Sequence, residues 1–357
     1  MMPSSLSRWL VGAGTLLALP AAMAAERVNV VTSFSILADM VENVGGEHVK
    51  VTSLVGADGD AHVFSPSPGD ARSLAQADLV VFNGLLFEGW MERLIDASDY
   101  SGPLVTATQG VDARAFSPQA EGDHSEHDEH GHDEHDEHDE HDEHGHDDHD
   151  DHEGHDEHDD HEGHAHGNED PHAWQDMQQA QVYVANIRDG LIEADSDNAD
   201  TYRANAERYL EEMAAVDSEM RDLLSEIPAS TTIITGHDSF GYFANAYGLR
   251  FLSPVGLSTE ADPSAASIAA LVDVIEEQDV QALFHENMTN QSIITQLAEE
   301  TGLPIAGTLY ADALASEGEA STYLGMMRHN AEVLNAALAQ PGHDDHHDSD
   351  HDDQHDH

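Results

Sequence analysis

The sequence contains no cysteine and only one lysine, Lys50, and its 12 lysine and arginine residues stand against 72 aspartate and glutamate residues. The absence of cysteine excludes disulfide bonds, metal sites built on thiolates and a lipid-anchoring cysteine. The formal net charge is −60 with histidine neutral. A chain this acidic repels nucleic acids and anionic membrane surfaces and attracts cations, so we expect no nucleic-acid partner.

Histidines and acidic residues are concentrated in two tracts. Residues 123–166 hold 16 His and 22 Asp or Glu, and residues 343–357 hold six His and seven Asp. Such segments bury too little apolar surface to offset the entropy lost on ordering them. We therefore expect a disordered loop over residues 121–168 and a disordered tail over residues 341–357.

The first 24 residues have the features of a secretory signal peptide. Arg8 gives a short positive region, the stretch WLVGAGTLLALPAAMA is apolar, and Ala22-Met23-Ala24 fits the small-residue rule for cleavage. A transmembrane anchor is the alternative, but the apolar run is short for a span and contains Gly and Pro. The sequence predicts a cleaved signal peptide over residues 1–24 and a location in the periplasm.

Strand-like and helix-like segments alternate in both halves of the chain. The stretches VNVVTS, DLVVFN, TTIITG and VQALFHE have the pattern of strands, and helical patterns separate them. Between the halves, a segment with few helix breakers predicts one long helix over residues 198–227, which Pro228 ends. The sequence therefore predicts an α/β fold of two lobes, residues 25–190 and 228–340, with mainly parallel sheets. One long rigid helix joins them, and a ligand cleft lies between them.

Three of the six histidines outside the tracts occupy polar loops at the ends of predicted elements. His62 lies in DGDAH, His172 in DPHAW and His237 in TGHD, and Asp312 follows a predicted strand in YADA. Three imidazoles and one carboxylate make a four-coordinate site that suits Zn²⁺, whereas Mn²⁺ prefers more oxygen ligands and higher coordination. Spacing alone leaves a surface or capping role open for each histidine, because the four residues are far apart in the sequence.

A series of segments over about residues 28–338 carries a likeness to a known family: VVTSFSILADMVENVGG, LVGADGDAHVFSPSP, ADLVVFNGLLFEGW, DPHAW, TGHDSFGYFANAYGL, STEADPSA, and LYADAL with STYLGMMRHN. The chain resembles the zinc and manganese class of periplasmic substrate-binding proteins of ABC transporters, most closely the zinc-binding members. This resemblance implies a metal held in the cleft between the two lobes, with His62, His172, His237 and Asp312 at the ligand positions. Histidine at the third position resembles the zinc binders, whereas many manganese binders have glutamate there.

The resemblance also implies the role and the partners. We expect a high-affinity zinc-binding component of an importer that delivers Zn²⁺ to a membrane permease and its ATPase. A zinc metallochaperone is a further candidate partner, and the chain is expected to be a monomer. A manganese- or iron-binding protein of the same transporter class and a periplasmic zinc buffer remain the alternatives.

We do not expect an enzyme. Four protein ligands leave no open position for a water nucleophile, and the H-E-x-x-H motif of zinc hydrolases is absent from the sequence. The two histidine-rich tracts are expected to bind additional zinc ions weakly and to pass zinc to the cleft, because imidazole favours Zn²⁺ over Mn²⁺. Inert polar filler is the alternative for these tracts.

Six other histidine and acidic residues are not expected to be metal ligands. The sequence favours a structural role for His285 and Glu286, a surface or capping role for His48 and His329, and orientation of an imidazole through its second nitrogen for Asp60 and Asp238.

Overall fold

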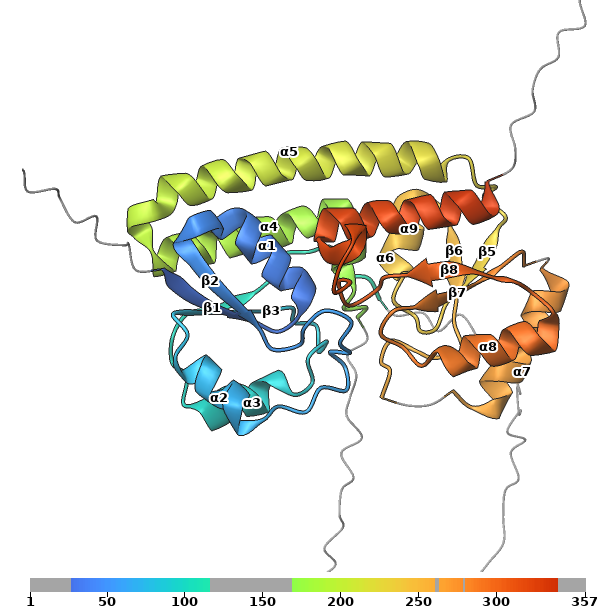
Figure 1. Ribbon diagram of the computed structural model, residues 1–357, viewed down its shortest axis with the longest axis horizontal. Coiled ribbons are helices and arrows are strands. Elements are labelled where there is room, and N and C mark those ends of the chain that lie inside the picture. Colours follow the sequence, from blue (N-terminus) through green and yellow to red (C-terminus); the bar gives the residue numbers. More distant parts are fainter. Residues whose placement is uncertain (1–26, 116–168, 261–262, 279, 340–357) are drawn as a thin grey trace, which may run out of the picture.

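A computed structural model describes residues 27–115, 169–260, 263–278 and 280–339 of the protein. Figure 1 shows two α/β lobes side by side beneath one long helix, α5 (Ala199–Leu224). The predicted signal peptide, the histidine-rich loop and the histidine-rich tail lie outside the described residues.

The first lobe is built on a four-stranded parallel sheet with the strand order β2-β1-β3-β4. Its central strands are valine-rich and buried, as expected for a parallel sheet covered on both faces. The strands are β1 (Val28–Thr32), β2 (Val49–Ser53), β3 (Leu79–Phe82) and β4 (Leu104–Thr106). In Figure 1, α1 (Ser35–Gly45) lies above this sheet, and α2 (Pro68–Ala75) and α3 (Met91–Ser98) lie below it.

The second lobe repeats this plan with the parallel order β6-β5-β7-β8. Its strands are β5 (Thr232–Ile234), β6 (Arg250–Leu252), β7 (Leu283–Glu286) and β8 (Ile305–Leu309). Its helices are α6 (Gly241–Tyr247), α7 (Ala265–Glu277) and α8 (Gln291–Thr301). Two parallel sheets of the same order confirm the predicted α/β class.

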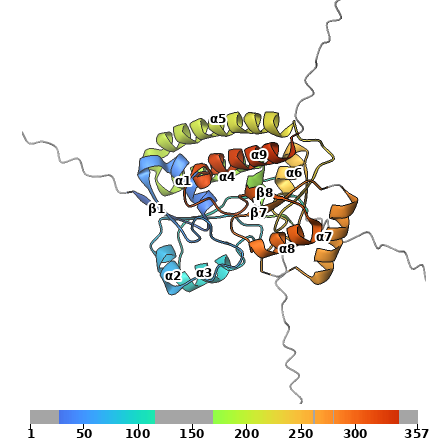
Figure 2. The same cartoon turned by 45° about the vertical axis from the view of Figure 1, so that its right-hand side comes forward.

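Three helices lie on the side of the lobes that is uppermost in Figure 1: α4 (Met177–Ala194), α5, and α9 (Tyr323–Leu338). Figures 1 and 2 show α5 running over both lobes with α9 beside it. The 26 residues of α5 reach about 39 Å at ~1.5 Å per residue. Its buried residues recur every three or four positions: Tyr202, Ala206, Tyr209, Met213, Val216, Met220 and Leu224. One apolar core extends from the first lobe past this face of α5 into the second lobe, so the lobes are firmly joined along α5.

One helix is shorter than its sequence pattern indicates. The pattern predicts a helix from Phe87, but α3 begins at Met91. Leu85 and Leu86 before it have φ angles of 52° and 60°, a left-handed conformation that is uncommon for such residues. The carboxylate of Glu88 accepts hydrogen bonds from backbone amides at the end of β3, which holds this turn in place. The turn buries Phe87 and leaves Leu86 55% exposed.

The loops that follow the strands of the two lobes meet at the interface between the lobes. The amide of Asp58 donates to the carbonyl of Leu314 at 2.9 Å, and the amide of Leu314 donates to the Ser35 hydroxyl at 3.0 Å. Open parallel sheets bind small ligands at the carboxyl ends of their strands. The division of the chain into domains at residues 25–190, 198–227 and 228–340 stays a prediction.

No helix in the described ranges has both the length and the apolar composition needed to cross a membrane.

Candidate metal centre

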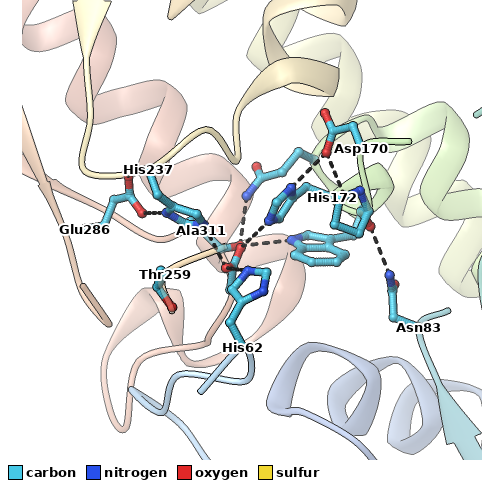
Figure 3. Close-up of polar contacts among 12 residues, drawn as sticks. His62, Asn83, Asp170, His172, His237, Thr259, Glu286 and Ala311 are labelled. Carbon is cyan, nitrogen blue, oxygen red and sulfur yellow. Dashed lines mark hydrogen bonds and ion pairs between the residues drawn. The ribbon is translucent and has the colours of Figure 1, made fainter. Parts of the chain in front are cut away.

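His62 lies in the loop that follows β2. The amide of His62 donates to Asp60 Oδ1 at 2.9 Å, and the carbonyl of the preceding Ala61 accepts from the indole of Trp90 at 2.8 Å. The ring of Phe87 packs edge-on against the imidazole, with ring centroids 4.7 Å apart. These contacts fix the peptide unit that precedes His62 and leave its Nε2 directed toward the second lobe (Figure 3).

His172 precedes a short 3-10 helix, Ala173–Gln175, that leads into α4. Oδ1 of Asp170 accepts from the His172 amide at 3.0 Å and lies 2.8 Å from Nδ1 of the same ring. The indole of Trp174 and the side-chain amide of Gln175 both donate to the carbonyl of Ala311, at 2.9 and 2.8 Å. The turn that carries His172 is therefore bonded directly to the backbone next to Asp312 in the other lobe.

His237 and Asp312 come from the second lobe, after β5 and β8 respectively. Glu286 at the end of β7 receives the amides of Gly236 and His237 on Oε1, at 2.7 and 2.9 Å. Its Oε2 lies 2.5 Å from His237 Nδ1. Pairing of Ile234 with Leu283 brings this glutamate and this histidine to the same level of the sheet. The second nitrogen of the His237 ring is thus left for another partner.

The imidazoles of His62, His172 and His237 converge on one point, as Figure 3 shows, and the contacts of Asp312 place its carboxylate at the same point. Oδ2 of Asp312 lies 3.0 Å from Nε2 of His237 and 3.2 Å from Nε2 of His62, and Oδ1 lies 3.7 Å from Nε2 of His172. One donor atom from each residue lies within 4.8 Å of all the others. All four side chains are buried, and His62 at 8% is the most exposed.

Three of the atoms that could bind a metal have no hydrogen-bond partner. They are Nε2 of His62, Nε2 of His172 and Oδ1 of Asp312. Buried polar atoms are normally satisfied, so their convergence calls for a further group. Three imidazole nitrogens and one carboxylate oxygen are a donor set that binds a divalent transition metal. The geometry therefore fits a metal ion at the centre of the cluster.

The charges of the cluster favour two protonated imidazoles when no metal is bound. Burial lowers the pKa of His172, but the charge of Asp312 and the contact with Asp170 outweigh it and raise this pKa to about 9. Burial is likewise outweighed for His237 by Glu286 and Asp312, which hold its pKa well above the usual value. Burial dominates for His62 and lowers its pKa. Burial would raise the pKa of Asp312, but the charged imidazoles of His237 and His172 hold it well below the usual range.

This charge pattern predicts proton release on metal binding. At pH 7.5 the rings of His172 and His237 carry protons that a metal must displace, whereas the His62 ring is already neutral. Binding of one equivalent of metal should therefore release about two protons, and affinity should rise with pH toward 9. Calorimetric titration in buffers of different ionisation enthalpy measures this number. Binding without proton release would contradict the pattern.

The supporting residues differ from those that the sequence singled out. Glu286, which the sequence favoured as structural, contacts a candidate ligand, and Asp170 takes the orienting role that was expected of Asp60 or Asp238. Within the described ranges, no carboxylate other than Asp170 and Glu286 contacts Nδ1 of a candidate ligand. Asp60 instead receives the backbone amide of His62. A bond to the residue two positions ahead is a common aspartate turn, so Asp-x-His was an available local signal.

The remaining histidines lie away from the cluster, as the sequence indicated. The ring of His48 packs edge-on against Tyr202, with centroids 6.1 Å apart. Nε2 of His329 lies 3.2 Å from the carbonyl oxygen of Thr308. His285 is partly buried at the end of β7, and burial lowers its pKa.

The sequence matches a family model and full-length relatives. The model for ZnuA, described as zinc-uptake complex component A, periplasmic, matches residues 30–337. The manganese-binding lipoprotein MntA of Halalkalibacterium halodurans is 31% identical over 317 residues, which cover 88% of this chain and 90% of that protein. The iron-binding protein YfeA of Yersinia pestis is 27% identical over 321 residues, which cover 88% of each protein.

Solved structures match over the same extent. The periplasmic zinc binding protein TroA from Treponema pallidum superposes with a TM-score of 0.72 at 23% identity, covering 88% of this chain and 100% of that one. A manganese-bound mutant of a periplasmic metal binding protein from Candidatus Liberibacter asiaticus gives a TM-score of 0.69 at 23% identity, covering 87% of this chain and 100% of that chain. These two likenesses show that the fold is shared.

Proposed function

Because the chain belongs to the family of periplasmic zinc-uptake component A, we propose that it captures Zn²⁺ between its two lobes and delivers it to the membrane. The chain is the metal-binding component of an ABC importer, with a membrane permease and an ATPase as its partners, and it is not an enzyme. What remains to be assigned is the metal, together with the residues that hold it.

One observation carries the proposal for zinc: the buried cluster of His62, His172, His237 and Asp312. Three imidazoles and one carboxylate complete the tetrahedral shell that Zn²⁺ adopts in closed sites. We assign these four side chains as the metal ligands. The formal net charge of −60 over the whole sequence raises the local concentration of any cation.

Manganese is the second candidate, and the names of the relatives favour it. MntA of Halalkalibacterium halodurans and MntA of Bacillus subtilis, 31% and 30% identical to this chain, are both named manganese-binding. Asp312 has two carboxylate oxygens facing the cluster, and binding through both would give a five-coordinate shell. Against this, Mn²⁺ prefers more oxygen than one carboxylate supplies, and an imidazole stands at position 237.

The two histidine-rich tracts, residues 121–168 and 341–357, would obscure a measurement of this preference. The ends of the first tract are already held together, since Ala115 and Glu169 form an antiparallel bridge and the Asp170 amide donates to the Arg114 carbonyl at 2.9 Å. Residues 121–168 can therefore be removed without separating the flanking backbone. We propose that the tracts collect zinc for the cleft, on the basis of their composition alone.

The preference should be measured by competition of Zn²⁺ against Mn²⁺ for the chain without either tract. We expect one tight zinc site per chain, because the donor set is nitrogen-rich. His237→Ala, measured in parallel, should lose this site. Preferential binding of manganese, or zinc binding that survives His237→Ala unchanged, would overturn the zinc proposal.

The location of the protein in the cell is proposed from its relatives and from its own sequence. The relatives MntA of Bacillus subtilis and SsaB of Streptococcus sanguinis are named lipoproteins, whereas this chain contains no cysteine. We propose a periplasmic protein released by cleavage after residue 24, a segment that lies outside the described residues.

A further inference from the structure

A cavity of about 580 Å³ opens beside the metal centre. Of the four proposed ligands, His62 alone lines it. Leu86 and Phe87 border it from the first lobe, and Ser258 and Glu260 border it from the second lobe. Val63 and Leu86 are 49% and 55% exposed at its rim, so the cavity connects His62 with the surface.

His62 is also the least constrained of the three imidazoles. Asp170 and Glu286 hold Nδ1 of His172 and His237, at 2.8 and 2.5 Å. In the part of the chain that the structure describes, no carboxylate contacts the corresponding nitrogen of His62, whose ring rests against the edge of Phe87. A metal ligand held by a carboxylate keeps its orientation, so His62 is the ligand that can turn away most easily.

A side-chain hydrogen bond joins the lobes beside the cavity. Oδ1 of Asp60 accepts from the His62 amide at 2.9 Å, and Oδ2 of the same carboxylate accepts from the Thr259 hydroxyl at 2.7 Å. Thr259 lies between the two residues that line the cavity from the second lobe. Figure 3 shows Thr259 near His62. This bond therefore ties the loop of the least constrained ligand to the opposite wall of the cavity.

A second set of contacts between the lobes, at Ala311, is buried. Trp174 and Gln175, both 0% exposed, donate to the carbonyl of Ala311, and the apolar core is continuous behind them. Parting the lobes there would expose a large apolar surface, whereas releasing Thr259 from Asp60 breaks one hydrogen bond. Asp58, in the same loop as Asp60, keeps its own bonds to Leu314, Asn287 and Ser316 of the second lobe. The contact at Thr259 is therefore easier to break than the buried contacts at Ala311.

We propose that metal enters and leaves the centre past His62, through this cavity, and that the hydrogen bond between Asp60 and Thr259 holds the route closed. The inference rests on the proposed function, since it takes the four residues as ligands. Thr259 is a positioning residue, because its hydroxyl acts through Asp60 and the loop of His62. Loss of its hydroxyl lowers the barrier to exchange in both directions.

The test uses the full chain loaded with one equivalent of Co²⁺. The strong visible absorption of four-coordinate Co²⁺ reports the cleft, and stopped-flow mixing with metal or chelator gives the association and dissociation rates. In Thr259→Val both rates should rise roughly tenfold, with little change in Kd, because one hydrogen bond to a charged group is lost. Thr259→Ser keeps the hydroxyl and should exchange at the rate of the unaltered protein.

A second variant tests the route itself. Ser258→Trp places a large ring in the cavity and should slow both rates by a similar factor. Unchanged rates in Thr259→Val or in Ser258→Trp overturn the inference, as does a Thr259→Val variant that loses affinity through faster dissociation alone. If the unaltered protein shows no four-coordinate Co²⁺ spectrum, the proposed function fails, and the inference fails with it.

Discussion

Replacing Asp312 with asparagine is expected to weaken zinc binding by roughly a hundred- to a thousandfold. Asp312 is fully buried and its two oxygens lie 3.0 to 3.7 Å from three imidazole nitrogens. It is the only carboxylate among the four proposed ligands. Asparagine keeps the shape of the side chain but removes the charge that a divalent cation requires. Removing one partner of a buried charge pair costs about 3–5 kcal/mol, and each 1.4 kcal/mol is about tenfold in affinity.

The measurement is a competition titration of Zn²⁺ against a chelator of known affinity. Asp78→Asn is a matched control, because Asp78 precedes β3 at the opposite end of the first sheet, where it accepts from the Asn29 amide at 2.8 Å. This variant should bind zinc like the unaltered protein. Thermal denaturation of the metal-free Asp312→Asn variant shows whether it is folded. A folded Asp312→Asn variant that binds zinc with full affinity would exclude Asp312 as a ligand.

Replacing Glu286 with glutamine is expected to weaken zinc binding by roughly 10- to 100-fold, the usual cost of losing a carboxylate behind a metal-bound histidine. Oε2 of Glu286 lies 2.5 Å from Nδ1 of His237 and fixes the proton on that nitrogen, which frees Nε2 for the metal. Glutamine can still accept from the amides of Gly236 and His237, so the backbone contacts can persist. Its amide donates toward Nδ1, however, and this favours the tautomer with the proton on Nε2.

A second readout separates this orienting role from a merely structural one. The charge of Glu286 contributes to the raised pKa of His237, so Glu286→Gln should lower that pKa and release about one proton on metal binding instead of about two. Asp170→Asn is the corresponding change for His172 and should behave in the same way. If Glu286→Gln lowers affinity but proton release stays the same, Glu286 supports the fold and does not orient His237.

The α/β class and the alternation of strands and helices could be predicted from the sequence, because buried valine-rich strands and helical periodicity are local signals. Contacts between residues far apart in the sequence could not be predicted in this way. Glu286 and His237 are 49 residues apart and meet only because β5 and β7 pair with Ile234 opposite Leu283. In a chain with 72 acidic residues, no local pattern selects the one carboxylate that reaches a given imidazole.

The start of α3 shows a different limit. The stretch from Phe87 to Ser98 has a helical pattern, but Glu88 bonds to backbone amides behind it and stabilises the left-handed turn at Leu85 and Leu86. The same carboxylate accepts from the hydroxyl of Ser33, 55 residues earlier in the chain, so a tertiary contact helps to override local propensity. The same turn places Phe87 against His62, so the departure from the helical pattern shapes the metal centre.

The most direct test of the central claim is X-ray absorption at the zinc edge, on the zinc-loaded chain without residues 121–168 and 341–357. Zinc held by His62, His172, His237 and Asp312 should give a four-coordinate spectrum with three imidazole nitrogens and one oxygen at ~2.0–2.1 Å. A shell with fewer than three imidazoles, or a six-coordinate shell rich in oxygen, would contradict the account.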